Sequence, residues 1–423
     1  MQDRYGLKLS TQSAAARDAY AEAMDVMLAG DAGAEHVLAK ALEADPDFAL
    51  AQAALARQQQ YLGDGRAARE EMKKALEMTA PSTEREQSHL NAMDLLIRGK
   101  MPDGYDAIRA HLKEHPRDAL LAQTCTGVFS LIGFSGLQGR EAEQLAFTSS
   151  LADAYGDDWW FLGQHAFSQV EAGQIGIADR NIDRALAGNP RSAHNAHIRA
   201  HVDYEAGSAA EGLQRLTGWL PGLGDTAIMY CHVNWHIALW SLESGDPDRM
   251  WKTYEAGVAP GGVWGPPINV ITDSVALLYR AQLAGVEVPA ARWSDLSAYA
   301  HEKFPRAGLA FVDVHAALAH AMSGDSDGLD SLIENAAGPA ADVVQAMASA
   351  FRSMAGGDWD GAIESLSTVM ATHERIGGSR AQRDLVEFCM AEAMRRSGKA
   401  DEARRMLAMR RPIHDPAAVV AGL

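Results

Sequence analysis

Two neighbouring segments of the chain carry histidine pairs with the same spacing. HNAHIRAHVDYEAG contains His197 and His201, and CHVNWHIALWSLESG contains His232 and His236. Residues four apart lie on one face of a helix, so each segment would direct two imidazoles to the same side. Such a pair is a bidentate ligand for zinc, and it is equally able to join a buried hydrogen-bond network. What the pairs do depends on the elements that position them.

Glycines recur at intervals of 33 to 41 residues, and they punctuate long segments with the apolar spacing of helices. Glycine suits a tight turn between two helices because it adopts the left-handed conformation at little cost. The turn glycines are Gly30, Gly63, Gly99, Gly136, Gly173, Gly207, Gly245, Gly285, Gly324, Gly357 and Gly398. The pattern predicts a series of helical hairpins in which each first helix ends at one of these glycines.

Alanine stands seven positions before nine of the eleven turn glycines, where a small side chain lets two helices approach closely. These residues are Ala23, Ala56, Ala92, Ala166, Ala200, Ala238, Ala317, Ala350 and Ala391, and the two exceptions are Phe129 and Leu278. Small residues at fixed positions with this period resemble the tetratricopeptide repeat. We therefore predict an all-α fold, a right-handed tetratricopeptide-like α-solenoid in which residues 1–423 form one domain of about ten to eleven helix pairs.

Two segments depart from the regular hairpins. Residues 256–270, AGVAPGGVWGPPINV, contain three prolines and four glycines and are predicted to form a loop inserted between two units. The C-terminal segment EARRMLAMRRPIHDP is basic and amphipathic, and we interpret it as a solvated helix that caps the last repeat.

The charge and the cysteines limit the classes of partner. A formal net charge of −18 argues against nucleic acid and against an anionic membrane surface. The chain contains no apolar run that could span a bilayer and no secretory signal at its N-terminus. Three cysteines far apart in the sequence suit a reducing compartment. We expect a cytoplasmic protein that binds neither nucleic acid nor membranes, and oligomerisation stays open.

Several segments resemble one family at positions that do not define the repeat. They are YGLKLSTQS (5–13), HIRAH (197–201), YCHVNWHIALWSLESGD (230–246), NVITDSVALLYRAQLAGV (269–286), FVDVHAALAHAMSGD (311–325) and IGGSRAQRDLVEF (376–388). In these segments the chain is similar to the tetratricopeptide repeat protein 38 family. The resemblance covers most of the chain but not the region around residues 100–160. It implies the repeat architecture and no particular activity.

Polar residues gather in the first helix of the hairpins, which lines the concave side of such solenoids. The candidate ligand-binding residues are His165, His197, His201, His232, Asn234, His236, Asp273, Tyr279, Arg280, Asp313, His315 and Arg383. Consecutive first helices lie roughly 9–10 Å apart. The two histidine pairs could therefore meet in a common cavity, with Asp273 reaching them from the next helix.

Three interpretations of these histidines compete. In the first, they are partly buried hydrogen-bonding groups that support packing between repeats, next to Trp235 and Trp240. In the second, they form a polar pocket on the concave face that recognises a small molecule or an extended peptide. Arg280 would favour a carboxylate or phosphate group in that pocket.

The third interpretation is a site for a divalent metal such as zinc, with His197, His201, His232, His236 and Asp273 as the candidate ligands. A hydrolytic version would use Asp273 or Asp313 as a general base that activates water. The glutamate of an HExxH motif is missing, and no nucleophile elbow or phosphate-binding loop is present. The sequence therefore favours a cytoplasmic binding scaffold, with a metal-assisted hydrolase as the alternative.

The segment GGSRAQRD precedes a predicted helix near the C-terminus. Its free N–H groups, with Arg380 and Arg383 nearby, could bind an anion. In the alternative interpretation, which we favour, Ser379 is the N-cap of that helix, and Arg383 and Asp384 attach the last repeats to their neighbours.

Overall fold

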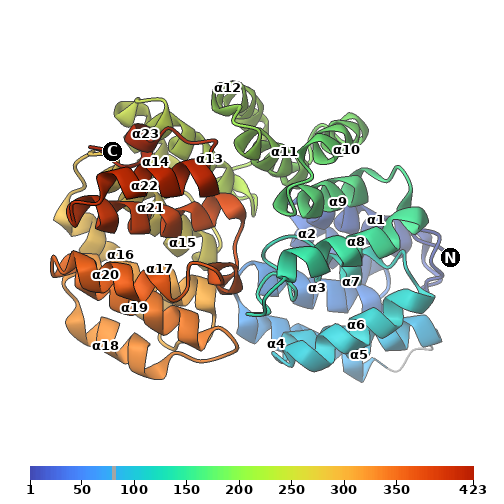
Figure 1. Cartoon of the computed structure of the whole chain (residues 1–423). Coiled ribbons are helices and arrows are strands. Elements are labelled where there is room, and N and C mark those ends of the chain that lie inside the picture. Colours follow the sequence, from blue (N-terminus) through green and yellow to red (C-terminus); the bar gives the residue numbers. More distant parts are fainter. Residues whose placement is uncertain (79–81) are drawn as a thin grey trace.

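The computed structural model describes residues 1–78 and 82–423, and these residues form an all-α solenoid of tetratricopeptide type (Figure 1). The first helices of the hairpins are α1 (Ala14–Ala29), α3 (Ala49–Tyr61), α5 (Glu84–Ile97), α7 (Ala119–Gln123), α9 (Trp159–Glu171), α11 (Ala193–Glu205), α13 (Tyr230–Glu243), α15 (Pro267–Leu283), α17 (Ala310–Ser323), α19 (Ala341–Ala355) and α21 (Arg380–Arg396). The second helices are α2 (Ala34–Ala44), α4 (Gly65–Glu77), α6 (Met101–Glu114), α8 (Arg140–Tyr155), α10 (Ile175–Gly188), α12 (Ala209–Trp219), α14 (Pro247–Gly257), α16 (Ala290–Lys303), α18 (Ser326–Asn335), α20 (Trp359–Ser367) and α22 (Ala400–Arg410). The remaining helical turns are η1 (Leu220–Gly222), η2 (His373–Ile376) and α23 (Pro416–Val419).

The features that predicted the hairpins have the expected geometry. All eleven turn glycines adopt positive φ angles, between 71° and 86°. The nine alanines before them are at most 2% exposed, as close approach of the paired helices requires. With the exception of α7, each first helix packs against the second helix that follows it. Within the described residues, no helix combines the length and the apolar character needed to cross a bilayer.

The first helix that was predicted to end at Gly136 is much shorter than expected. Helix α7 stops at Gln123, and residues 124–139 form turns. The hydroxyls of Thr124 and Thr126 bond back to carbonyls three residues earlier, and Gly127 takes a positive φ of 76°, so the helix cannot continue. This unit is also one of the two that lack the alanine, and the helix predicted there is wrong.

The two irregular segments also have defined bounds. Helix α14 ends at Gly257 and α15 begins at Pro267, so the intervening segment comprises residues 258–266. The C-terminal segment contains α22. We had predicted a solvated helix, but part of this segment is buried. Arg411 is buried between Glu205 and Asp384, and it binds both carboxylates.

The superhelix is wound so tightly that its concave side is covered where the polar residues lie. A Cβ added at Gly30 would lie 2.8 Å from the ring of His194, and one at Gly63 would lie 3.1 Å from Pro267. Helix α21 packs against both α11 and α15. In Figure 1, α11 lies between the blue-to-teal N-terminal half and the yellow-to-red C-terminal half. The predicted concave wall is therefore an interior.

Candidate functional site

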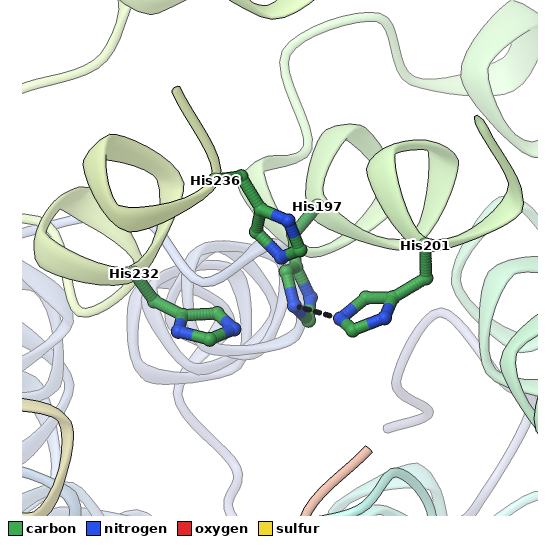
Figure 2. A group of neighbouring side chains, drawn as sticks. All are labelled: His197, His201, His232 and His236. Carbon is green, nitrogen blue, oxygen red and sulfur yellow. Dashed lines mark hydrogen bonds between the residues drawn. The ribbon is translucent and has the colours of Figure 1, made fainter. Parts of the chain in front are cut away.

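Helices α11 and α13 bring the four histidines His197, His201, His232 and His236 together. One ring nitrogen from each lies within 4.8 Å of one from every other, and ring centroids are 4.5 to 6.4 Å apart. Figure 2 shows the imidazoles converging between the two helices. Their residues are between 0% and 5% exposed. The predicted convergence of the two pairs is thus present, but in a buried cluster.

The helices hold these side chains through ordinary local rules. Ser192 caps α11 by accepting the N–H of Asn195. Ala200 and Ala238, the small residues of the two hairpins, are buried between paired helices. On α11 and α13 almost every residue is buried, so the histidine face is directed inward together with the apolar ones. The i, i+4 spacing then directs both pairs to the same point.

The hydrogen bonds within the cluster are incomplete. His197 and His201 share one bond between their Nε2 atoms, 2.8 Å apart, and His232 Nδ1 bonds to Asp273 at 2.7 Å. Within the described residues, neither ring nitrogen of His236 has a partner, and Nδ1 of His201 has none. Each unsatisfied buried group costs about 1–3 kcal/mol. Three ring nitrogens of the cluster are therefore buried without a hydrogen-bond partner in the described part of the chain.

Burial affects the protonation of three of the four imidazoles. Burial, and then repulsion from the neighbouring imidazoles, lowers the pKa of His197, His201 and His236 well below the ordinary value. These rings are neutral at pH 7, and each exposes a lone pair on one nitrogen. Neutral imidazole is the form in which histidine ligates metal ions.

Two buried carboxylates and the first turn of α21 surround the histidines. Glu171 Oε1 lies 3.9 Å from Nδ1 of His201, and its other oxygen accepts the N–H of Arg380 at 2.8 Å. Gln382 lies 3.5 Å from the carboxylate of Asp273. Burial raises the pKa of Glu171 to about 7. The C-terminal repeats thus close the site over α11 and α13.

The segment GGSRAQRD combines both of its predicted roles. Ser379 caps α21 in a capping box with Gln382, as we had favoured. The anion beside this helix N-terminus is the protein's own Glu171, bound by the N–H of Arg380. Arg383 donates to the Gly378 carbonyl at 2.6 Å and pairs with Glu141 of α8. It therefore attaches α21 to a helix distant in sequence.

Three predicted site residues lie outside the histidine cluster, because they contact second helices of the solenoid. His165 bonds to Thr148 of α8 at 2.9 Å. Asn234 lies between His232 and His236 on α13, but it donates to the carbonyl of Tyr230 and packs against Gly257. Tyr279 packs edge-on against Trp293 of α16, with ring centroids 6.3 Å apart.

Three more lie outside the cluster: one joins helices, and two bond at the start of α17 or within it. Arg280 donates to Tyr204 at 3.3 Å and to the carbonyl of Ala381, which joins α15 to α11 and α21. The carboxylate of Asp313 accepts the N–H of Gly308 at the start of α17, and burial raises its pKa to about 6. His315 bonds to the Phe311 carbonyl at 2.6 Å. Asp273 bonds directly to His232, so neither predicted general base faces an open site.

Sequence reasoning missed Glu171 and the role of Gln382, because they reach the histidines from helices α9 and α21. It also missed two further clusters, His89 with His111 and Asp118, and His301 with His320 and Asp325. Both clusters combine a first helix with the second helix of a hairpin. Each cluster has only one histidine on a first helix, so no i, i+4 pair of histidines indicated it.

The two cavities that stand out among the described residues do not contain the four histidines. One, of about 10 Å³, is lined by Arg280 and Glu243 and has room for about one water molecule. The other, of about 520 Å³, is a surface hollow along α8, lined by Glu141 and neighbouring residues. Neither of these two cavities is lined by the histidine cluster.

The comparisons with known proteins concern the fold alone. No family model matches the chain. Among solved structures it is similar to a tetratricopeptide repeat protein from Parabacteroides merdae (13% identity over 72% of this chain and 98% of that one, TM-score 0.33). It is also similar to the human IFIT1 dimer with m7Gppp-AAAA (13% identity over 95% and 90%, TM-score 0.45) and to yeast Tom70 (14% identity over 95% and 84%, TM-score 0.37).

Proposed function

We propose that this chain is a tetratricopeptide-type binding scaffold whose interior holds one transition-metal dication of the zinc class on His197, His201, His232 and His236. The observation that carries the proposal is the convergence of four buried ring nitrogens within 4.8 Å, three of the cluster's nitrogens having no partner among the described residues. Tetrahedral coordination by imidazole needs metal–nitrogen distances of about 2.0–2.1 Å. Small rotations of the four rings would give that geometry.

The charges around the cluster favour a dication over other ligands. Asp273 binds His232 directly, and Glu171 lies near His201. These two carboxyl groups would lower the cost of placing two positive charges among the imidazoles. A carboxylate on the outer nitrogen of a metal-bound histidine fixes the ring and raises its basicity. Asp273 is thus an orienting group in this proposal, where the sequence had suggested a direct ligand.

The ligand in this proposal is an ion, because the histidines are buried and neither of the two cavities described above is lined by them. Four protein ligands leave no open coordination position, which is the pattern of structural metal sites. The same burial disfavours the metal-assisted hydrolase, since a substrate could not reach the metal. Membership of the tetratricopeptide repeat protein 38 family and a cytoplasmic location are part of this proposal, supported by the motifs and by the three separate, buried thiols.

Metal analysis of full-length protein purified without a histidine tag tests the proposal. We expect up to one equivalent of zinc, nickel, copper, cobalt or iron in the interior site, lost in His201→Ala and retained in His165→Ala. The control removes a histidine of the same solenoid that lies outside the cluster. If chelator-treated protein binds none of these ions in titration calorimetry, and the two variants behave alike, the proposal is wrong.

A further inference from the structure

A second group of metal-ligating side chains lies at the surface, between α16, α17 and α18. Nε2 of His301 is 2.7 Å from Oδ2 of Asp325, and Nδ1 of His320 is 3.1 Å from the same oxygen. The hydroxyl of Ser297 also lies 2.9 Å from it. Two imidazoles and a hydroxyl thus converge on one carboxylate oxygen.

Helix capping does not explain this convergence. Four second helices begin with an aspartate that accepts a backbone N–H of the first turn, and these caps are Asp64, Asp246, Asp325 and Asp358. In the α18 cap the Oδ1 atom accepts the N–H of Gly328 at 3.0 Å, which leaves Oδ2 free for other partners. Among the described residues, Asp325 is the only one of the four caps that binds imidazoles. The two histidines are therefore additional to the cap.

The space around the site is also matched to these side chains. A Cβ added at Gly328 would lie 2.5 Å from Oδ2 of Asp325 and 3.0 Å from the ring of His301. Glycine in a helix costs about 1 kcal/mol relative to alanine. At this position it leaves the Asp325 carboxylate and the His301 ring the space that a larger residue would take. The His301 side chain is 55% exposed, which gives an ion a direct path from solvent.

We propose that His301, His320 and Asp325 form a second, exchangeable site for a divalent transition-metal ion of the zinc class. Two imidazoles and one carboxylate supply three ligands, and solvent supplies the rest, as in open zinc sites. The ion would connect α16 to the following hairpin of α17 and α18. This site shares no residue with the interior histidine cluster, so it stands or fails independently of the function proposed above.

Zinc titration of chelator-treated, tag-free, full-length protein against a chromophoric chelator tests the site. We expect a zinc equivalent that His301→Ala weakens at least tenfold, since even second-shell changes cost 10–100-fold. Asp325→Ser should weaken it similarly while retaining an N-cap. His36→Ala is the control, because His36 is a histidine with an 83% exposed side chain that belongs to none of the three clusters.

Circular dichroism of each variant establishes that it folds. His201→Ala removes the interior equivalent and should leave the zinc affinity of this one unchanged, which separates the two proposals. If His301→Ala and Asp325→Ser bind zinc with the stoichiometry and affinity of wild type, the second site is refuted. Equal weakening by His36→Ala would also refute it, because the binding would then be adventitious.

Discussion

Replacing His236 with leucine distinguishes a metal ligand from a packing residue, because the two roles predict different responses to metal. His236 is fully buried, and neither of its ring nitrogens has a partner among the described residues. Each unsatisfied buried group costs about 1–3 kcal/mol in the metal-free protein. Leucine has a similar volume and no polar atom to desolvate. With chelator present, we therefore expect His236→Leu to be as stable as wild type, or more stable by up to about 3 kcal/mol.

Metal reverses this order. An ion at a thousand times its dissociation constant stabilises the folded protein by about 4 kcal/mol. The variant has lost one of four ligands and gains much less at the same concentration. Wild type should therefore become the more stable protein in zinc.

Guanidinium unfolding followed by circular dichroism, with chelator or with excess zinc, measures both free energies. His165→Leu is the matched control, since it makes the same substitution at a half-buried histidine that bonds to Thr148 outside the cluster. We expect its free-energy change to be the same in both conditions. If His236→Leu instead loses several kcal/mol equally in chelator and in zinc, the residue only packs, and the metal-site reasoning fails.

Three further predictions follow from single contacts. Asp273→Asn should weaken zinc binding at the interior site by about 10–100-fold, measured by chelator competition, because the carboxylate bound to His232 would be lost. Arg411→Met should destabilise the chain by about 3 kcal/mol in chemical unfolding, because the two buried carboxylates lose the cation they share and keep only other partners such as Arg380 and His414, and an unchanged midpoint would contradict this. Burial lowers the pKa of His194, His315 and His373 to about 4, so their neutral rings favour folding above pH 6.5 and this contribution is lost as the pH falls towards 4. At pH 5.5 each of these three histidines would lower the free energy of unfolding of the metal-free protein by about 1.4 kcal/mol. The raised pKa of Glu171 would offset about one of these three contributions. Thermal melts at pH 7.5 and 5.5 measure the difference.

The repeat was predictable because its signals are local. A turn glycine needs a positive φ, and an alanine seven positions earlier needs only the partner helix of its own hairpin. Both requirements hold wherever a hairpin forms. Gly207 and Ala200 therefore predict a turn that is present in the structure. The one failure, at residues 124–139, occurs where hydroxyls and Gly127 compete with the helix. These residues are visible in the sequence, but the spacing of glycines and alanines carries no information about their effect on the helix.

The histidine pairs were predictable for a similar reason. Two i, i+4 pairs on consecutive first helices must face the same side, so their convergence follows from hairpin geometry. Their burial does not follow, because it depends on the pitch of the superhelix. Contacts such as Gly30 with His194 join residues far apart in sequence, and no local pattern encodes them. The sequence therefore predicted which residues meet, but it placed them in an open hollow.

The same long-range contacts link the interior site to the closure of the superhelix. The first turn of α21 supplies the N–H of Arg380 to Glu171 and the amide of Gln382 to Asp273, so both carboxylates gain a partner when the C-terminal repeats are docked. Docking depends in turn on ion pairs such as that of Arg383 with Glu141. In the proposed site, the metal ion and the docked α21 would stabilise the same arrangement of Glu171 and Asp273. Variants that weaken the ion pairs of α21 are therefore expected to bind the metal more weakly.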